Sequence, residues 1–238
     1  MKKLYLKKFG TISYFIVWIV DGQYIRRAID KDFTNFGQHW RFKFIPKNEF
    51  WLDKERKEDE YRYYVDHLLV ENRLMKQGKS YAFALEKADL VEKKERSKSK
   101  LLRKYFLRDT RKKIPKEIYK RLLKKYSDKL KIWIVDGNLV RDLFYIDFTE
   151  GGHDKVYNFI PKNEIWLDDD VSFKEMNFIL LHEIYERNLM CNGWKYDPES
   201  KKKKSAHKAA SVIEYYCRHH PKLLDKTIKT ELSKVIIL

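Results

Sequence analysis

The chain has 238 residues, of which 43 % are hydrophobic and 15 % aromatic, with 8 glycines and 5 prolines. This composition excludes a disordered or fibrous chain and is sufficient for one large or two small packed domains. Lys and Arg number 52 against 35 Asp and Glu, a formal net charge of +17, which favours polyanionic partners. The two cysteines, Cys191 and Cys217, cannot form a disulfide framework, so we expect a reducing compartment.

The chain contains the same pattern twice. Residues 16–81 align without gaps with residues 131–196, and 26 of the 66 aligned pairs are identical. The repeated words include WIVDG, FIPKNE-x-WLD and H-x-x-x-E. After a seven-residue insertion in the second copy the register returns, and its matching residues are Ala84, Ala88 and Glu92 with Ala206, Ala210 and Glu214. The sequence therefore predicts an internal tandem repeat.

Each copy predicts the same elements in the same order. WIVDG (18–22 and 133–137) indicates a strand entering a hairpin with Asp-Gly as its turn. In the second copy VYNFIP (156–161) and EIWLD (164–168) indicate two further strands. These segments predict a small antiparallel sheet at the start of each unit.

Two helices should follow each sheet. In the second copy, Ser172 and Glu175 form a capping box, which predicts a helix from there to about Met190, with Gly193 as the stop signal. A second helix is expected over about 205–218. The predicted fold class is α+β: a tandem repeat whose units each have a small antiparallel sheet followed by two helices.

The repeat also suggests the domain boundaries. We expect a degenerate first unit over 12–95, a basic helical connector over 96–130 and a second unit with the candidate site over 131–220. Residues 221–238 would form a C-terminal tail.

The positive charge is concentrated in the connector. Residues 93–131 contain 18 Lys and Arg against 4 Asp and Glu. Within them, residues 115–125 read as an amphipathic helix. Such a segment would bind nucleic acid or another polyanion through phosphate contacts, within a larger nucleoprotein assembly. The alternative is a solvated helical linker.

No membrane span is expected, because no apolar stretch reaches the roughly 18 residues that a membrane helix needs. Residues 1–20 have a basic start and an apolar run like a secretory signal, but no small-residue cleavage site follows. The word WIVDG at the end of this run also recurs at 133–137, far from any N-terminal signal. We expect a soluble, cytoplasmic protein, or a virion-associated one if the chain is viral.

The candidate chemistry lies in the second copy, in the helical segment His-Glu-Ile-Tyr-Glu (182–186). At about 100° per residue, His182, Glu183 and Glu186 share one arc with the apolar Ile179 and Met190. Acidic groups on such an inward face are costly unless they are paired, protonated or bound to a cation. His182 and Glu186, four residues apart, can hold one ion between them, with Glu183 as the general base for an activated water.

The next helix offers candidates to complete this site. His207 and Glu214, seven residues apart, share a face of that helix, so one can be a ligand while the other supports the site. The cofactor would be a divalent metal. The alternative is a buried polar network that braces the two helices without a metal.

A third contact is expected from His153, in the loop Thr-Glu-Gly-Gly-His. Glycines there would permit close approach to a ligand, so His153 would be a substrate-side residue or a fourth contact of the metal. Alternatively, Gly151-Gly152 is a plain hairpin turn and His153 lies on the surface.

The first copy lacks part of this set. It keeps His67, Glu71 and Glu92 as counterparts of His182, Glu186 and Glu214. It has Leu68, Leu85 and Gln38 where the second copy has Glu183, His207 and His153. Three ionisable groups are absent together, which indicates that they serve one task and that any activity belongs to the second copy.

The string PKNEIWLD…LLHEIYERNLM…G…Y…AH…A…E resembles small uncharacterised domains of phages and other mobile elements. More distantly, a strand followed by a helix bearing His-Glu resembles the zincin plan. This resemblance implies zinc bound by His182 and Glu186, Glu183 as the base, and a third ligand from a later helix. The chain has HExxE where zincins have HExxH, and the additional carboxylate also suits Mn²⁺ or Fe²⁺.

Two functions follow as hypotheses. The first is a metal-dependent hydrolase-like protein with one site in the second repeat and a basic connector that binds a polyanion. The second is a non-catalytic structural protein associated with nucleic acid or with a nucleoprotein such as a virion or ribosome, in which the His/Glu cluster is a brace.

Overall fold

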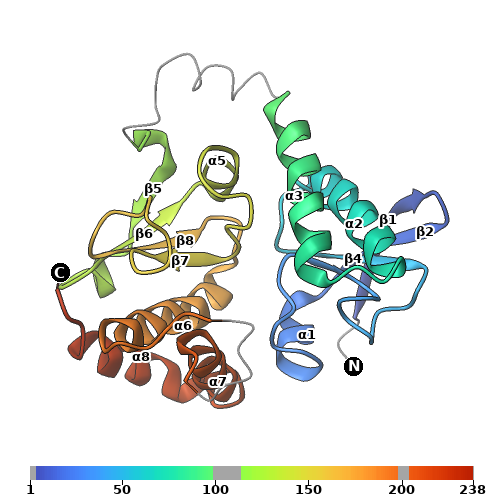
Figure 1. The fold of residues 1–238 in the computed structure, drawn as a ribbon. Helices are drawn as coiled ribbons and strands as arrows, with labels where there is room; N and C mark the ends of the chain where they lie inside the picture. The colour runs from blue at the N-terminus through green and yellow to red at the C-terminus, as the bar shows by residue number, and fades with distance from the viewer. Residues whose placement is uncertain (1–3, 99–113, 198–203, 238) are drawn as a thin grey trace. The chain divides into compact units, whose positions relative to one another are not determined.

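The computed structural model describes residues 4–98, 114–197 and 204–237. Their contacts divide the chain into two compact units: Met1–Ile114 with Asn138–Asp147, and Pro115–Gly137 with Phe148–Leu238. The described residues form two four-stranded sheets and seven α-helices, an α+β fold (Figure 1).

The first unit contains a sheet with the strand order β1-β2-β4-β3. Its elements in chain order are β1 (Tyr5–Ile12), β2 (Phe15–Val20), α1 (Gly22–Ala28), β3 (Phe36–Gln38), β4 (Glu49–Asp53), α2 (Tyr61–Lys76) and α3 (Tyr81–Ser97).

The second half of the chain has the same strand order, β5-β6-β8-β7. Its strands are β5 (Tyr119–Leu122), β6 (Lys131–Val135), β7 (Gly151–His153) and β8 (Glu164–Asp168), and its α-helices are α5 (Gly137–Leu143), α6 (Phe173–Cys191), α7 (Ala206–His219) and α8 (Leu224–Ser233). The central pairs have the same register in both sheets, with Trp18 beside Trp51 and Trp133 beside Trp166.

The prediction of antiparallel sheets is confirmed for the outer pairs, β1–β2 and β3–β4 in one sheet and β5–β6 and β7–β8 in the other. It is wrong for the central pairs β2–β4 and β6–β8, which are parallel, so both sheets are mixed. The Asp-Gly pair does not turn a hairpin. Instead the Asp21 side chain accepts a hydrogen bond from the Tyr24 N–H and caps α1. A helix between two strands provides the crossover that parallel pairing requires.

The prediction of a strand over residues 156–161 is also wrong. The backbone N–H groups of Val156 and Tyr157 both donate to the carbonyl of His153, so the chain turns as soon as β7 ends. The ring of Tyr157 packs over Gly152, where a Cβ would overlap it. The edge strand beside β8 is therefore β7, which lies in the segment that we expected to be a loop, while β6 pairs with the other side of β8.

The amphipathic helix expected over 115–125 is absent as well. The described part of this segment forms the short 3₁₀ turns Lys116–Ile118 and Lys124–Tyr126 on either side of β5. β5 is an edge strand that pairs antiparallel with β6, so the segment extends the sheet instead of forming a helix. Residues 99–113 of the expected connector lie outside the described residues, and nucleic-acid binding through 93–131 stays a prediction.

The two helices expected after the second sheet are confirmed. The Ser172 side chain accepts from the N–H of Glu175 and caps α6, and α7 covers Ala206–His219. The sequence assigned no element to the C-terminal residues, yet these contain α8. Ile228 of this helix belongs to the same hydrophobic core as Leu180 and Ile184 of α6.

Helices α6, α7 and α8 lie on one side of the second sheet (Figure 1). Residues from β6, β8 and these helices form its core, including Ile132, Ile165, Leu167, Ile179 and Cys217. Helix α6 is therefore buried, and the polar groups on its inner face must find partners within the protein. No helix in the described ranges has the length and hydropathy that crossing a membrane requires.

The repeated words WIVDG and WLD are explained by one contact. A Cβ on Gly22 would overlap the carboxylate of Asp53, and a Cβ on Gly137 would overlap that of Asp168. The glycine after the second strand and the aspartate at the end of the parallel strand are therefore needed as a pair.

We predict that Gly137→Ala lowers the free energy of unfolding by ~1–3 kcal/mol, because the methyl group must displace the buried Asp168 carboxylate. Urea denaturation measures the change. Gly10→Ala is the control, since a Cβ at Gly10 meets no atom within 4 Å. Equal effects of the two substitutions would contradict the close approach.

Candidate metal centre

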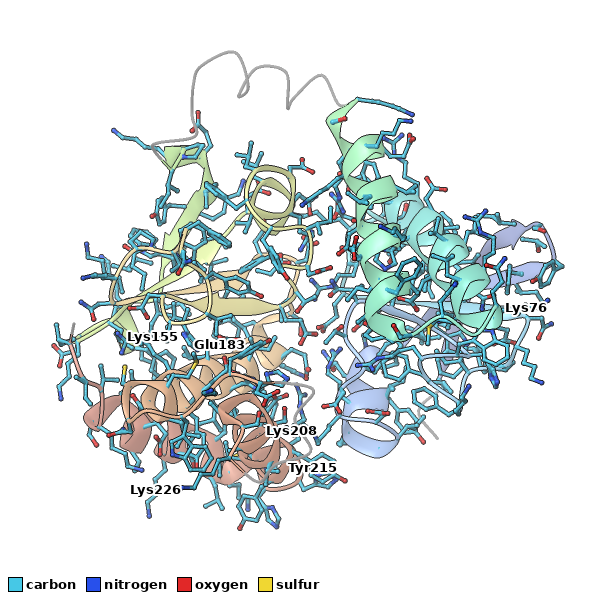
Figure 2. All side chains as sticks on the ribbon, in the orientation of Figure 1. Lys76, Lys155, Glu183, Lys208, Tyr215 and Lys226 are labelled. Carbon is cyan, nitrogen blue, oxygen red and sulfur yellow. The ribbon has the colours of Figure 1, made fainter. Side chains whose placement is uncertain are left out.

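The second unit brings together all six residues that the sequence singled out. His153 ends the edge strand β7, while His182, Glu183 and Glu186 lie on α6, and His207 and Glu214 lie on α7. Figure 2 shows Glu183 between α6 and the sheet of this unit. The expectation that α6 turns these polar groups inward is confirmed, since His182, Glu183 and Glu186 are all buried.

Three donor atoms form a compact triangle, here called the donor cluster. His207 Nδ1 lies 3.0 Å from Glu186 Oε2 and 3.2 Å from His182 Nε2. The third edge, from His182 Nε2 to Glu186 Oε2, is 3.4 Å. These groups are close enough together to hold a metal ion.

The dimensions of the donor cluster fit a first-row metal ion. Donors about 2.0–2.1 Å from a tetrahedral zinc ion lie about 3.3–3.4 Å from one another. Neighbouring donors of an octahedral ion at about 2.1 Å lie about 3.0 Å apart. The observed edges of 3.0–3.4 Å span both values, so the spacing accommodates zinc as well as a harder ion.

The orientation of the His182 ring is fixed by a hydrogen bond at Nδ1, on the side of the ring that faces away from the donor cluster. Its Nδ1 lies 2.9 Å from Glu214 Oε2, so a proton on Nδ1 donates to that carboxylate. Arg218 Nε donates to Glu214 Oε1 at 2.9 Å, and Arg218 Nη1 donates to Glu175 Oε2 at 2.7 Å. With its proton on Nδ1, the neutral imidazole has a lone pair on Nε2, which faces the donor cluster.

Burial and charge shift the pKa values of these groups in opposite directions. Burial lowers the pKa of His182, but hydrogen bonds to Glu186 and Glu214 outweigh it and raise the pKa well above its usual value. Burial raises the pKa of Glu186, but the three histidines around it hold the pKa below its usual range. Without a metal, the cluster is thus stabilised by an imidazolium beside carboxylates.

Glu214 follows the same pattern. Burial alone would raise the pKa of its carboxyl group, but the hydrogen bond with His182 and the charge of Arg218 lower it to about 2. Glu214 is therefore an anion that supports His182, which makes it a supporting residue rather than a member of the donor cluster.

Glu183 lies beside the donor cluster with a different character. Burial raises the pKa of its carboxyl group to about 8, with the negative charge of Glu186 as the second cause. Its carboxylate accepts no hydrogen bond within the described part of the chain. It does lie close to Gly151, where a Cβ would come 3.3 Å from Glu183 Oε1. A carboxyl group without a fixed hydrogen-bond partner among the described residues therefore lies next to the donor cluster.

The first unit contains the same supporting arrangement. His67 Nδ1 lies 3.0 Å from Glu92, and Arg96 bridges Glu92 and Glu60 at 2.9 and 2.7 Å. These residues match His182, Glu214, Arg218 and Glu175 in the repeat. We call each set the His–Glu–Arg–Glu chain, and it is common to both units.

The donor side differs between the units. Leu68 and Leu85 occupy the places of Glu183 and His207, so the corresponding place in the first unit has one imidazole, that of His67, and no counterpart of Glu183. The place of Gly151 is taken by Phe36, whose ring lies 5.0 Å from that of His67 and covers it. In the second unit no side chain at residue 151 covers His182.

The two outer members of each His–Glu–Arg–Glu chain, the arginine and the second glutamate, are not among the site residues predicted from the sequence. Glu60 and Glu175 are identical across the repeat, as are Arg96 and Arg218 after the insertion. Identity between the copies was therefore a usable signal. Charge alone does not identify these residues, because charged residues on a helix are usually solvated, whereas these four are buried.

A third acidic group, Asp168, Asp169 and Asp170, also has carboxylates near one another. These carboxylates have structural partners, since Asp168 accepts from the Asp170 N–H and Asp169 accepts from the Gly137 N–H. They lie at the end of β8 and in the turn that follows it, and no histidine belongs to this group.

The first unit provides a prediction for pH. Burial lowers the pKa of His67, but Glu71 and Glu92 outweigh it and raise the pKa from 6.5 to about 10. The folded state therefore retains this proton where the unfolded chain has lost it, and the resulting stability is complete below pH 6.5. It should decline by up to about 1.4 kcal/mol per pH unit as the pH rises towards 10.

Denaturant unfolding of the protein and of His67→Gln in EDTA, between pH 6 and pH 10, measures this contribution. The difference between the two free energies of unfolding should shrink with rising pH. A constant difference would show that His67 is neutral in the folded protein.

Comparison with protein-family models, curated proteins and solved structures gives no match. The geometry of the donor cluster and of its surroundings is therefore the observation that bears on function.

Proposed function

We propose that the second unit binds one divalent metal ion through His182, Glu186 and His207, and that the protein is a metal-dependent hydrolase-like enzyme. The main support is the donor cluster, in which two imidazole nitrogens and one carboxylate oxygen converge with edges of 3.0–3.4 Å. Two histidines and one carboxylate are the ligand set of several catalytic zinc and iron sites.

A catalytic metal site needs a coordination position that solvent can reach. The partly exposed side chain of His207 marks the side on which the donor cluster is accessible. Its side chain is 32 % exposed, while those of His182 and Glu186 are 10 % and 3 % exposed. A water or a substrate oxygen can therefore reach the ion from the side of His207. When bound, the ion would polarise that oxygen and lower the pKa of a bound water.

Glu183 is the residue that we propose as general base. It follows His182 directly, and its carboxylate has no hydrogen-bond partner within the described ranges that would hold it away from a water. In its ionised form this carboxylate would accept the proton of a water held at the ion. Gly151 leaves the space beside this carboxylate free of a side chain.

A structural brace is the alternative function of the cluster. It is favoured by the His–Glu–Arg–Glu chain, which holds the two helices together in both units whether or not a second histidine is present. Under this alternative the second unit would hold a proton where we propose a metal, as His67 does. Metal analysis distinguishes the two.

We predict about one equivalent of bound metal per chain, measured by elemental analysis and by calorimetric titration with Zn²⁺, Mn²⁺ and Fe²⁺. His207→Leu introduces the residue that the first unit has at this place, so the fold should tolerate it. It should lower affinity by more than the about 10- to 100-fold that loss of a supporting residue costs.

Glu71→Gln is the matched control, since Glu71 is the first-unit counterpart of Glu186. Its metal content should equal that of the unmodified protein. A protein that folds and binds no metal, or a His207→Leu variant with unchanged affinity, would refute the metal site and favour the brace.

We further predict that Glu183→Gln retains the metal but loses hydrolysis by about 10²- to 10⁴-fold, because the proton acceptor is removed while the ligands stay. The assay is turnover of peptide, phosphodiester and carboxylic-ester probes by the metal-loaded protein. A variant with full turnover would exclude Glu183 as the base.

A further inference from the structure

His153 lies behind Glu186, completely buried at the end of β7. Its Nε2 is 3.0 Å from Glu186 Oε1, the carboxylate oxygen that is not part of the donor cluster. Its Nδ1 accepts a hydrogen bond from the backbone N–H of Lys155 at 3.1 Å. Both ring nitrogens therefore have partners.

These two contacts determine where the proton of His153 lies. A ring nitrogen that accepts a hydrogen bond carries no proton, so the proton of the neutral imidazole is on Nε2. The Nε2–H group then donates to Glu186 Oε1. In this tautomer His153 has no lone pair available for a metal, and binding one would require losing the hydrogen bond from Lys155.

The first unit tests this assignment with a different side chain. Gln38 takes the place of His153, and its Oε1 accepts from the N–H of Trp40 at 2.7 Å, two residues later. Its Nε2 donates to Glu71 Oε1 at 2.6 Å. An amide thus makes the same pair of contacts as the imidazole: it accepts from the backbone and donates to the glutamate.

We infer that His153 is a positioning residue for the proposed metal site and not a ligand. It holds Glu186 Oε1 so that Oε2 faces His182 and His207, and the centre takes one ion. This inference rests on the proposed function, and it opposes a second reading of the same residues. His153, Glu183 and Glu186 also offer donor atoms within 4.8 Å of one another, which would make a second ion bridged by Glu186 conceivable.

The test compares His153→Gln with His153→Leu by competition of the loaded protein against a chelator. The glutamine is the side chain that the first unit uses, so we expect one equivalent of metal and an affinity within about threefold of the unmodified protein. The leucine cannot donate to Glu186 and should lower affinity about 10- to 100-fold at the same stoichiometry.

If His153→Gln loses as much affinity as His207→Leu, His153 is a ligand and the inference is wrong. Two equivalents in the unmodified protein that fall to one in His153→Gln would establish the two-ion centre instead. Rescue by glutamine but not by leucine is a result that a purely packing role would not produce.

A second measurement does not depend on metal. Long-range ¹H–¹⁵N spectra of the metal-free protein at neutral pH report which ring nitrogen of each histidine carries the proton. We expect His153 with its proton on Nε2 alone, and the Nδ1–H tautomer would overturn the inference. A protein that shows the Nε2–H tautomer but binds no metal would refute the proposed function while retaining the orientation of Glu186 by His153.

Discussion

The candidate site of the second unit depends on the hydrogen bonds that orient the imidazole of His182. His182 donates from Nδ1 to Glu214, and Glu214 is held in turn by Arg218, which also pairs with Glu175. Each of these charges is buried or nearly so, and removing any one would leave its neighbour unpaired in a poorly hydrated environment. The His–Glu–Arg–Glu chain thus fixes the angle of the imidazole and joins α6 to α7. The residues on the Nε2 side of the ring can then differ between the two units.

The Nε2 side of the ring distinguishes the two units. In the first unit His67 faces Glu71, with Phe36 over its ring, so the histidine is sealed among carboxylates and keeps a proton. In the second unit the covering ring is replaced by Gly151, and a second histidine enters from α7. A proton and a metal ion are alternative ways of supplying positive charge to the same buried carboxylates. The same His–Glu–Arg–Glu chain therefore supports two arrangements: a closed one around a protonated histidine in the first unit, and an open one with three convergent donor atoms in the second.

The sequence predicted the helices and the candidate residues better than the sheet. The inward arc of α6 follows from periodicity, and the capping box at Ser172 is a local signal, so both were accessible from the chain alone. The Asp-Gly pair was misread because it is equally suited to a hairpin and to the first residues of a helix, and only the close approach of Gly22 to Asp53 decides between them. β5 was missed because its pairing partner lies beyond a turn, and an isolated Lys-rich segment with spaced apolar residues also fits a helix. The tautomer of His153 depends on the Lys155 backbone, which periodicity does not describe.

The origin of the three donors on two helices has a mechanical consequence. His182 and Glu186 belong to α6, whereas His207 belongs to α7, close to its first residue. An ion bound to all three would act as a cross-link near the beginning of α7, while Glu214 and Arg218 fasten its later turns. Binding of the ion and packing of the beginning of α7 against α6 would then be coupled. Release of the ion would loosen the beginning of α7. Binding of the proposed ion would therefore be visible as a change in local rigidity at the beginning of α7.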